Sequence, residues 1–438
     1  MTLDRKSFLR RLGTGSVGLF AGSALRGAEN TAASAAQSAQ PPAPLPAFDA
    51  RAPEPFWSAV RAQFSLDPAL AYFNTGGLGP AARPVLDAAA ALTASLQKKS
   101  EHGHELFAGA RATVAKFLGA SPDEIAFVRN ATEGNAIIAA GLRLAPGDEV
   151  IFDSHAHPGG AFPWLHQEKL RGIVTKLFEP DPHDPAGNVA RIAALMTKRT
   201  RVVQVSHVTA PTGIVLPVAD IARLCRERGV WFHIDGAQTA GMFPFSLPAL
   251  GGDSFATSGH KWWGGPLETG VLHVRRDRIA EVEPPLVGSY SGELESPTLP
   301  TKLHLVPTAV RFEYGTRNVA AAVGLAEAAQ FQERLGRDRL AARGRELSAR
   351  VRTGLAAIKG VEILTPAPAT GTGSAMLTFR AAAMRYDKLF ERLVKEHRCR
   401  CRPVSEQGLD AIRVSTHFFN SPAECDRLVA AVEKILRA

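Results

Sequence analysis

Polar and apolar residues alternate with two different periods along this chain of 438 residues. From residue 123 onward, short runs of β-branched and aromatic residues alternate with stretches in which apolar residues recur every three or four positions. The first pattern is typical of buried strands and the second of amphipathic helices. We predict strands at residues 125–128, 149–152, 174–178, 202–206, 231–234, 254–257 and 271–274, and helices at 132–141, 189–197 and 218–228.

The order of these elements indicates an α/β fold. Strands that alternate with helices form βαβ units, which build a mostly parallel sheet with helices on both faces. After residue 317 the pattern changes, because long helical segments at 319–334 and 337–358 lead into short strands and a closing helix at 422–436. We therefore predict a large domain at residues 70–315 and a smaller α+β domain built from residues 50–69 and 316–438.

The first 46 residues differ in composition from the rest of the chain. Residues 5–9 read RKSFL, a mildly apolar stretch rich in Gly, Ala and Ser follows at 12–25, and an Ala/Ser/Gln/Pro tract extends to residue 46. This order is typical of an export signal followed by a flexible linker. The segment resembles a twin-arginine signal, in which a basic pair precedes Phe-Leu, although Lys6 stands where the second arginine is usual. We expect export of the folded protein through the twin-arginine translocon to the periplasm; the alternative is a disordered tail on a cytoplasmic protein.

Composition narrows the classes of function. With 45% hydrophobic residues the chain can bury more than one core. A run of about eighteen uninterrupted apolar residues is absent, so we predict no membrane span. The formal net charge is +9, but basic and acidic residues alternate without a long basic run, so nucleic acid is not an expected partner. The glycine motifs GxGxxG and GxxxxGK[ST] are also absent, which removes support for a dinucleotide or P-loop site.

Four cysteines are too few for a disulfide framework in a chain of this length. Cys225 and Cys425 fall in predicted helices, where a free cysteine behaves as a small apolar residue. Cys399 and Cys401 alternate in a strand-like run and should point to one face. We expect core packing for all four, with a metal pair or a catalytic thiol as the alternative.

Residues 230–265 are the most informative segment of the chain. We expect Asp235 at the end of an apolar strand and Lys261 on the next strand. An acid and an amine so placed fit pyridoxal 5'-phosphate (PLP), because a lysine holds its aldehyde as a Schiff base and a carboxylate keeps its ring nitrogen protonated. Lys261 can then also act as the base at the substrate α-carbon. The alternative is a buried strand followed by a surface lysine.

Residues beside this pair can complete such a site. Ser258 and His260 lie shortly before Lys261 and can donate hydrogen bonds to a phosphate. Gln238 can reach the phenolic oxygen of the ring. Ala131 and Thr132 follow a predicted strand and open a helix, where backbone N–H groups and the helix dipole favour an anion. Asn and Thr before a helix are also ordinary N-caps, so both interpretations stay open.

Two His-x-His pairs suggest a different class of function. His102 and His104 form one pair, and His155 and His157 form another after a predicted strand. Such pairs can present two rings to one metal, so a periplasmic metal-binding protein is the second hypothesis. No carboxylate cluster at ligand spacing accompanies these histidines.

Several segments together resemble a known family. HIDGAQTAG at 233–241 and SGHKWWGGPLETGVL at 258–272 are joined by YFNTGGLGP at 72–80, FVRNATEGN at 127–135, SHVTAPTG at 206–213, FEYGTRN at 312–318 and IRVSTHFFN at 412–420. In this order they resemble the class V aminotransferase family of fold-type-I PLP enzymes, in particular its isopenicillin N epimerase-like branch. The resemblance implies a large domain with a mostly parallel seven-stranded sheet and a smaller α+β C-terminal domain.

The resemblance also implies roles for individual residues. It places the PLP phosphate at the Ala131–Thr132 turn and a ring that stacks on the cofactor at His157, with His155 as the other register. Arg413 would bind the substrate α-carboxylate by bidentate hydrogen bonds, with Asn74 as a second contact; an ordinary ion-pair arginine is the alternative.

In this family, a residue that matches Thr316 reaches the phosphate of the neighbouring subunit. This implies a homodimer with shared active sites.

The expected activity is PLP-dependent chemistry at the amino group or α-carbon of an amino acid or an amino-acid-containing small molecule. Cysteine desulfurases, which are similar in sequence, carry a nucleophilic cysteine on the loop before the residue that matches Arg413. Here that loop reads RPVSEQGLDAI and holds no thiol, so persulfide chemistry is not expected. Aminotransferase and epimerase activities remain equal expectations, and a C–S or β-elimination lyase is the alternative.

Overall fold

The computed structural model describes residues 45–184, 186–293, 302–367 and 373–437. Its largest sheet has seven strands, which lie in the order β2-β8-β7-β6-β5-β3-β4. Strand β8 is antiparallel to both of its neighbours and all other pairs are parallel, which confirms the predicted mostly parallel seven-stranded sheet. The strands are β2 (Ile125–Val128), β3 (Glu149–Asp153), β4 (Val174–Phe178), β5 (Thr200–Ser206), β6 (Trp231–Asp235), β7 (Ser254–Ser258) and β8 (Gly270–Val274).

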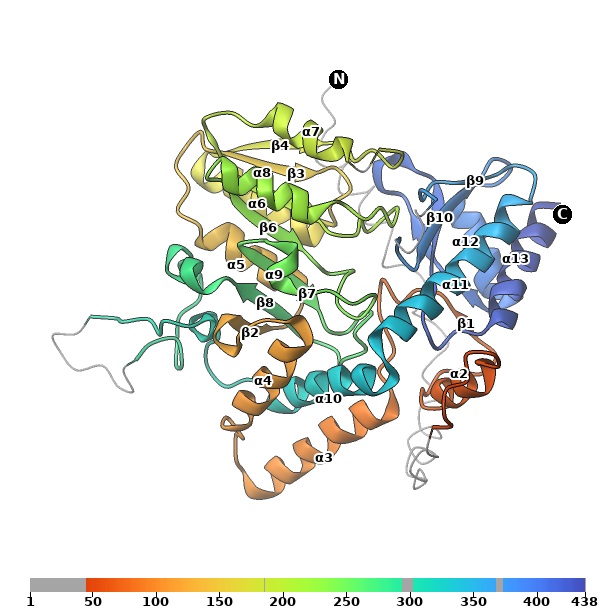
Figure 1. Ribbon diagram of the computed structural model, residues 1–438, viewed down its shortest axis with the longest axis horizontal. Coiled ribbons are helices and arrows are strands. Elements are labelled where there is room, and N and C mark those ends of the chain that lie inside the picture. Colours follow the sequence, from red (N-terminus) through yellow and green to blue (C-terminus); the bar gives the residue numbers. More distant parts are fainter. Residues whose placement is uncertain (1–44, 185, 294–301, 368–372, 438) are drawn as a thin grey trace, which may run out of the picture. The chain divides into compact units, whose positions relative to one another are not determined.

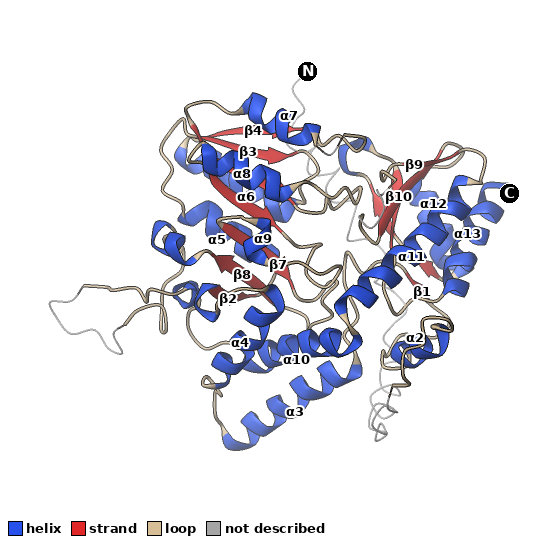
Figure 2. Ribbon diagram, in the orientation of Figure 1, coloured by secondary structure: helices blue, strands red, loops and turns tan. Residues whose placement is uncertain are grey.

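Helices follow the strands in the predicted alternation (Figures 1 and 2). Every residue of β2, β3, β6, β7 and β8 is buried, as expected for strands covered on both faces. Because crossovers between parallel strands are right-handed, the steps from β2 to β3 to β4 and the returning steps from β4 to β5 to β6 place their helices on opposite faces. Accordingly α5 packs against α6, and α7 against α8. These helices are α5 (Ala131–Gly141), α6 (Pro158–Arg171), α7 (Gly187–Leu195) and α8 (Val218–Glu227), followed by the short α9 (Leu247–Leu250).

The C-terminal part contains an antiparallel four-stranded sheet in the order β12-β13-β10-β9. Beside it, β1 (Ala71–Tyr72) pairs in parallel with β11 (Cys399–Arg400). The larger sheet consists of β9 (Val361–Ile363), β10 (Met376–Ala381), β12 (Arg402–Val404) and β13 (Ala411–Ser415), and its helices are α11 (Arg337–Ala356), α12 (Tyr386–His397) and α13 (Pro422–Arg437). This arrangement agrees with the predicted α+β architecture.

Three further helices near the large sheet pack together: α3 (Arg83–Lys99), α4 (Leu106–Leu118) and α10 (Val319–Leu335). The N-terminal α2 (Glu54–Arg61) is tied to the C-terminal part by the Arg61–Glu424 ion pair at 2.7 Å. Short 3-10 helices lie at Pro122–Glu124, Arg276–Glu281, Ala309–Phe312 and Glu406–Gly408. Because residues 46–438 pack into one compact unit, the predicted division into two domains stays a prediction.

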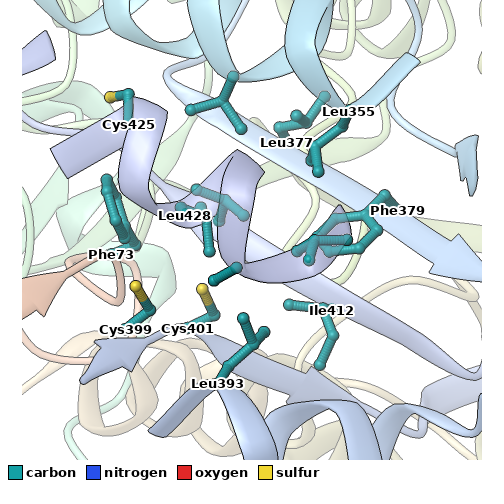
Figure 3. Packing of buried hydrophobic residues seen from close by; sticks show 14 of the residues in the cluster. Phe73, Leu355, Leu377, Phe379, Leu393, Cys399, Cys401, Ile412, Cys425 and Leu428 are labelled. Carbon is teal, nitrogen blue, oxygen red and sulfur yellow. The ribbon is translucent and has the colours of Figure 1, made fainter. Parts of the chain in front are cut away.

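All four cysteines are buried and free. Cys399, Cys401 and Cys425 pack among apolar side chains of the C-terminal core, with Phe73 from the N-terminal side of the chain (Figure 3). Cys225 is buried on α8. The thiols therefore contribute to packing, as predicted.

The predicted export signal at 1–46 lies outside the described residues except for its last two positions. Across the described part of the chain, the helices are too short or too polar to cross a membrane.

Candidate active site

A cavity of about 250 Å³ lies where the parallel strands of the large sheet end. Segments at the carboxyl ends of several strands line it: Thr132 after β2, His157 after β3, Ala210 after β5, Asp235 at the end of β6 and Ser258 at the end of β7. Ligands of open α/β sheets bind outside these strand ends. The sheet thus brings together side chains that are far apart in sequence.

Lys261 lies in this cavity, but the prediction that it belongs to a strand is wrong. Strand β7 ends at Ser258, and Lys261 lies in the following turn. The backbone leaves the sheet because the Gly264 N–H donates to the Lys261 carbonyl and the Gly79 N–H donates to the His260 carbonyl. Desolvation lowers the pKa of the Lys261 ammonium to about 8, with further lowering by Arg413 and Arg402, although Asp235 opposes the shift.

Asp235 is 5% exposed and held at both carboxylate oxygens. Its Oδ1 accepts a hydrogen bond from the Ala237 N–H at 2.9 Å, and its Oδ2 accepts one from Asn135 Nδ2 at 2.9 Å. These two hydrogen bonds fix the orientation of the carboxylate at the edge of the cavity. Asp235 can therefore compensate a positive charge in the cavity.

The start of α5 forms one wall of the cavity. Asn130 caps the helix by accepting from the Glu133 N–H, and the Ala131 N–H donates to Ser258 Oγ at 3.0 Å. Among the described residues, the Thr132 N–H has no hydrogen-bond partner, and Thr132 itself lines the cavity. Together with the Ser258 hydroxyl hydrogen and the helix dipole, this end of the helix can bind a phosphate. The N-cap and anion-site interpretations are thus compatible.

His260, which precedes Lys261 in the chain, also lines the cavity. Within the described part of the chain its buried Nδ1 has no hydrogen-bond partner. Burial lowers the pKa of its ring, so at neutral pH His260 is uncharged.

The structure places His157 on the cavity wall and His155 outside it. His157 Nδ1 accepts from the Gly159 N–H at 3.0 Å and caps α6. Burial and the charge of Lys261 lower the pKa of His157 to about 4. The neutral ring therefore carries its hydrogen on Nε2. His155 is instead bound between Thr212 and Glu179.

Gln238 also lines the cavity, and both ends of its amide make hydrogen bonds. Nε2 donates to the Gly76 carbonyl at 2.9 Å, and Oε1 accepts from Trp262 Nε1 at 2.6 Å. One amide hydrogen remains for a ligand in the cavity, so contact with a phenolic oxygen is chemically possible.

Arg413 is the cationic group on the C-terminal side of the cavity and is 1% exposed. Nη1 donates to the Ala210 carbonyl at 2.7 Å, and Nη2 donates to Asn74 Oδ1 at 3.2 Å. Its Nε is buried without a partner among the described residues. Asn74 contacts Arg413 and lies beside Gly77, which lines the cavity, so its predicted contact with substrate stays a prediction.

Sequence reasoning missed two polar residues of this cavity, Asn135 and Arg402. Asn135 is the one polar side chain among the buried residues of α5, and that mismatch is the signal that marks it. Arg402 follows the buried Cys401 in the alternating run and forms an ion pair with Glu406. In an alternating strand the residue next to a core cysteine faces the opposite side, which here is the cavity.

Thr316 does not line this cavity in its own chain, and its predicted contact with the phosphate of a neighbouring subunit stays a prediction. It lines a separate surface cavity with Arg129, Glu133 and Tyr314. The structure therefore does not bring Thr316 to the phosphate wall within one chain.

The His-x-His pairs do not converge on a metal site. His104 stacks on Tyr290 with ring centroids 3.8 Å apart, whereas His155 and His157 have separate partners. Among the described residues, no group of three or more His, Cys, Asp or Glu side chains could hold a metal ion. The metal-binding hypothesis has no geometric support here.

The cavity fits PLP on three observations. A lysine with lowered pKa and a buried carboxylate lie in it, and a helix N-terminus lies on its wall. The backbone at the start of α6 also passes very close to Thr132 and Asp235. A Cβ on Gly159 would lie 2.2 Å from Thr132 Oγ1, and one on Gly160 would lie 2.8 Å from Asp235 Oδ2. The phosphate would bind to Ala131, Thr132, Ser258 and His260, and the reactive end of the cofactor would lie at Lys261 and Asp235.

Comparisons with known proteins agree with this geometry. Residues 83–428 match the family model described as aminotransferase class-V. Isopenicillin N epimerase of Amycolatopsis lactamdurans is 33% identical over 400 residues, which cover 86% of this chain and 98% of that protein.

Two solved structures share the fold. The apo structure of cysteine desulfurase from Thermococcus onnurineus NA1 has a TM-score of 0.78 at 25% identity and covers 89% of this chain and 100% of that chain. A C-DES lysine mutant with glycine covalently linked to its PLP cofactor has a TM-score of 0.78 at 27% identity and covers 85% of this chain and 98% of that chain. The chain therefore belongs to the class V aminotransferase family of PLP-dependent enzymes.

Proposed function

We propose that this enzyme transfers a proton at the α-carbon of an amino acid or of an amino-acid-containing small molecule, as an epimerase or an aminotransferase. The observation that supports this proposal is the placement of Lys261, Asp235 and Arg413 around one cavity. When bound, PLP supplies an electron sink that stabilises negative charge at the α-carbon. The remaining chemistry depends on the side chains of this chain.

Lys261 is the proposed base. A general base works best when its pKa lies near the working pH, and desolvation lowers the pKa of Lys261 to about 8. A substantial fraction of a free Lys261 amine is therefore neutral at physiological pH and can accept the α-proton at Nζ.

Arg413 is the proposed carboxylate-binding residue. Its planar guanidinium can donate two hydrogen bonds to a carboxylate, and its bonds to the Ala210 carbonyl and Asn74 Oδ1 fix its orientation. An α-carboxylate at Arg413 would orient the α-carbon between the arginine and Lys261.

Arg402 adds a second positive charge on the same side of the cavity.

The buried cysteines argue against a persulfide mechanism. All four thiols are buried, and burial raises the pKa of each. A thiol needs its thiolate form to act as a nucleophile. Epimerase and aminotransferase chemistry need no thiol, and one relative is named isopenicillin N epimerase.

The test is incubation of the purified, PLP-loaded enzyme with a panel of L- and D-amino acids in deuterated buffer. Epimerisation gives deuterium at the α-carbon with inversion, and transamination gives a keto acid with an amino form of the cofactor. Release of sulfide or another β-substituent without either result would instead identify a lyase.

We further propose that the enzyme is a homodimer. Thr316 lies away from the cavity in its own chain, beside Leu267, whose side chain is 67% exposed. Leu267 also lines an apolar surface cavity with Leu78 and Leu86, which are 44% and 43% exposed. A group of exposed apolar side chains is typical of an interface between proteins. Light scattering gives the oligomeric state, and a purified monomer with full activity would overturn this proposal.

Export through the twin-arginine translocon is also proposed, on the RKSFL segment and the weakly apolar stretch that follows it. Residues 1–50 fused to a reporter that works only when folded before transport should deliver it outside the inner membrane. Replacing Arg5 and Lys6 by alanine should retain the reporter in the cytoplasm. Delivery in a host without this translocon would contradict the proposal.

A further inference from the structure

A chain of hydrogen bonds crosses the core of the large sheet and ends at Asp235. Trp231 Nε1 lies 3.0 Å from Ser254 Oγ, which lies 2.8 Å from His233 Nδ1. His233 Nε2 lies 2.8 Å from Asn135 Oδ1, and Asn135 Nδ2 lies 2.9 Å from Asp235 Oδ2. All five side chains are buried, and they come from β6, β7 and α5.

The orientation of the Asn135 amide follows from its neighbours. Its Nδ2 faces Asp235 Oδ2 and the Gly159 carbonyl, at 2.9 and 3.2 Å. Both are acceptors, so the nitrogen and not the oxygen must be on this side. Asn135 Oδ1 therefore faces His233, and because a carbonyl oxygen only accepts, His233 Nε2 must carry a hydrogen.

The donors and acceptors of the remaining hydrogen bonds then follow. Burial lowers the pKa of His233 to about 3, so the ring is neutral at physiological pH. With the hydrogen on Nε2, Nδ1 has a lone pair and accepts from the Ser254 hydroxyl. The Ser254 oxygen in turn accepts from the Trp231 N–H. Every hydrogen in the chain points toward Asp235.

This direction has a consequence for the carboxylate. Neighbouring hydrogen bonds polarise one another in a buried network. Donation to the Asn135 oxygen strengthens the Asn135 N–H as a donor to Asp235, which favours the ionised carboxylate in one orientation.

We propose that His233 is a positioning residue, which acts through Asn135 to orient Asp235 and keep it ionised against the protonated ring nitrogen of PLP. This inference rests on the proposed role of Asp235. A merely structural role, in which the histidine only satisfies buried polar groups, predicts lower stability but no change at the ring nitrogen.

The experiment uses enzyme reconstituted with PLP labelled with ¹⁵N at the ring nitrogen. The nitrogen chemical shift, followed against pH, reports whether the ring is protonated. His233→Leu removes the donor to Asn135, so the ring should lose its proton at lower pH, with about a tenfold fall in kcat and little change in KM. His233→Gln keeps an N–H donor and should restore most of the wild-type titration and rate.

The matched control is His207→Leu. His207 is also buried, burial lowers its pKa to about 4, and its side chain bonds Thr239 rather than the Asp235 chain. This variant should lose stability yet keep the wild-type nitrogen titration. An equal shift in His207→Leu and His233→Leu would overturn the proposal.

A milder variant protects the test against misfolding. Ser254→Ala removes the donor that fixes the His233 tautomer and should shift the nitrogen titration in the same direction by a smaller amount. Wild-type titration in folded His233→Leu, or in Ser254→Ala if His233→Leu does not fold, would overturn the proposal. Asp235→Asn separates the two levels of the argument, because an unchanged ring nitrogen in that variant refutes the role of Asp235 itself.

Discussion

Gly160, in the first turn of α6, lets the helix backbone pass close to Asp235 because it has no side chain. A Cβ at this position would lie 2.8 Å from Asp235 Oδ2 and 3.1 Å from Gln204 Nε2. Carbon and oxygen atoms that are not hydrogen-bonded pack at about 3.5 Å or more. In Gly160→Ala, either Asp235 or the start of α6 must therefore move by several tenths of an ångström.

Opposing contributions decide the outcome of this substitution. Alanine is favoured over glycine in a helix by about 1 kcal/mol. Overpacking costs about 1–3 kcal/mol, and displacement of Asp235 weakens its hydrogen bond from Asn135, which as a bond to a charged group is worth about 1.5–3 kcal/mol. The loss exceeds the gain, so we expect a net destabilisation on the order of 2 kcal/mol, centred on the cofactor site.

The assay is titration of apoprotein with PLP by absorbance, together with thermal unfolding. Gly160→Ala should bind PLP at least about tenfold more weakly and unfold at a lower temperature. Gly109→Ala is the matched control, because an added Cβ on this exposed residue of α4 meets no atom within 4 Å. That control should be as stable as the wild type or more so. Wild-type PLP affinity in Gly160→Ala would refute the close contact with Asp235.

Two further substitutions test the site, and a third tests the stability contribution of a buried carboxyl group. Lys261→Ala should abolish the borohydride-reducible attachment of PLP, and peptide mapping of the wild type that finds the cofactor on another lysine would reject Lys261. Arg413→Lys should raise KM for an α-carboxylate substrate by about tenfold or more without bleaching the cofactor, because an ammonium cannot make the two-pronged contact; an unchanged KM would reject Arg413. Burial, assisted by the charge of Asp235, raises the pKa of Asp153 to about 7. Its protonated form therefore stabilises the fold fully below the ordinary carboxyl pKa of 3.8, and this contribution is lost as pH rises toward 7. Asp153→Asn should remove that loss and be more stable than the wild type at pH 8 by up to about 4 kcal/mol, as measured by denaturant unfolding; equal stability at that pH would contradict it.

The sheet could be predicted from the sequence because short runs rich in β-branched and aromatic residues mark its strands. Runs such as IAFV in β2 and WFHID in β6 are buried throughout, so their pattern does not depend on distant partners. The ends of the predicted helices lie within two residues of those observed, and Asn130 is a local cap of the first one. Helix α6, which His157 caps, was not predicted.

Site residues next to strand ends were predictable for the same reason. Asp235 and Ser258 end β6 and β7, and the carboxyl ends of parallel strands meet at one edge of the sheet. Lys261 was assigned the wrong local structure because its turn depends on Gly79, which is far away in sequence. Asn135 was missed since its partners His233 and Asp235 lie about a hundred residues further along the chain.

Arg402 and Arg413 show why some residues of the cavity are hard to predict from the local sequence. The two arginines are direct partners across the antiparallel strands β12 and β13, where like charges oppose each other at a cost in stability. Glu406 forms an ion pair with Arg402 and attracts Arg413 without contacting it, while Arg413 is almost fully buried with carbonyl and amide partners of its own. Folding rules alone disfavour this pair, and positions that break such rules are expected where function requires them. The pair lines the cavity that also holds Lys261, so an anion bound there would offset the repulsion that the sheet sustains.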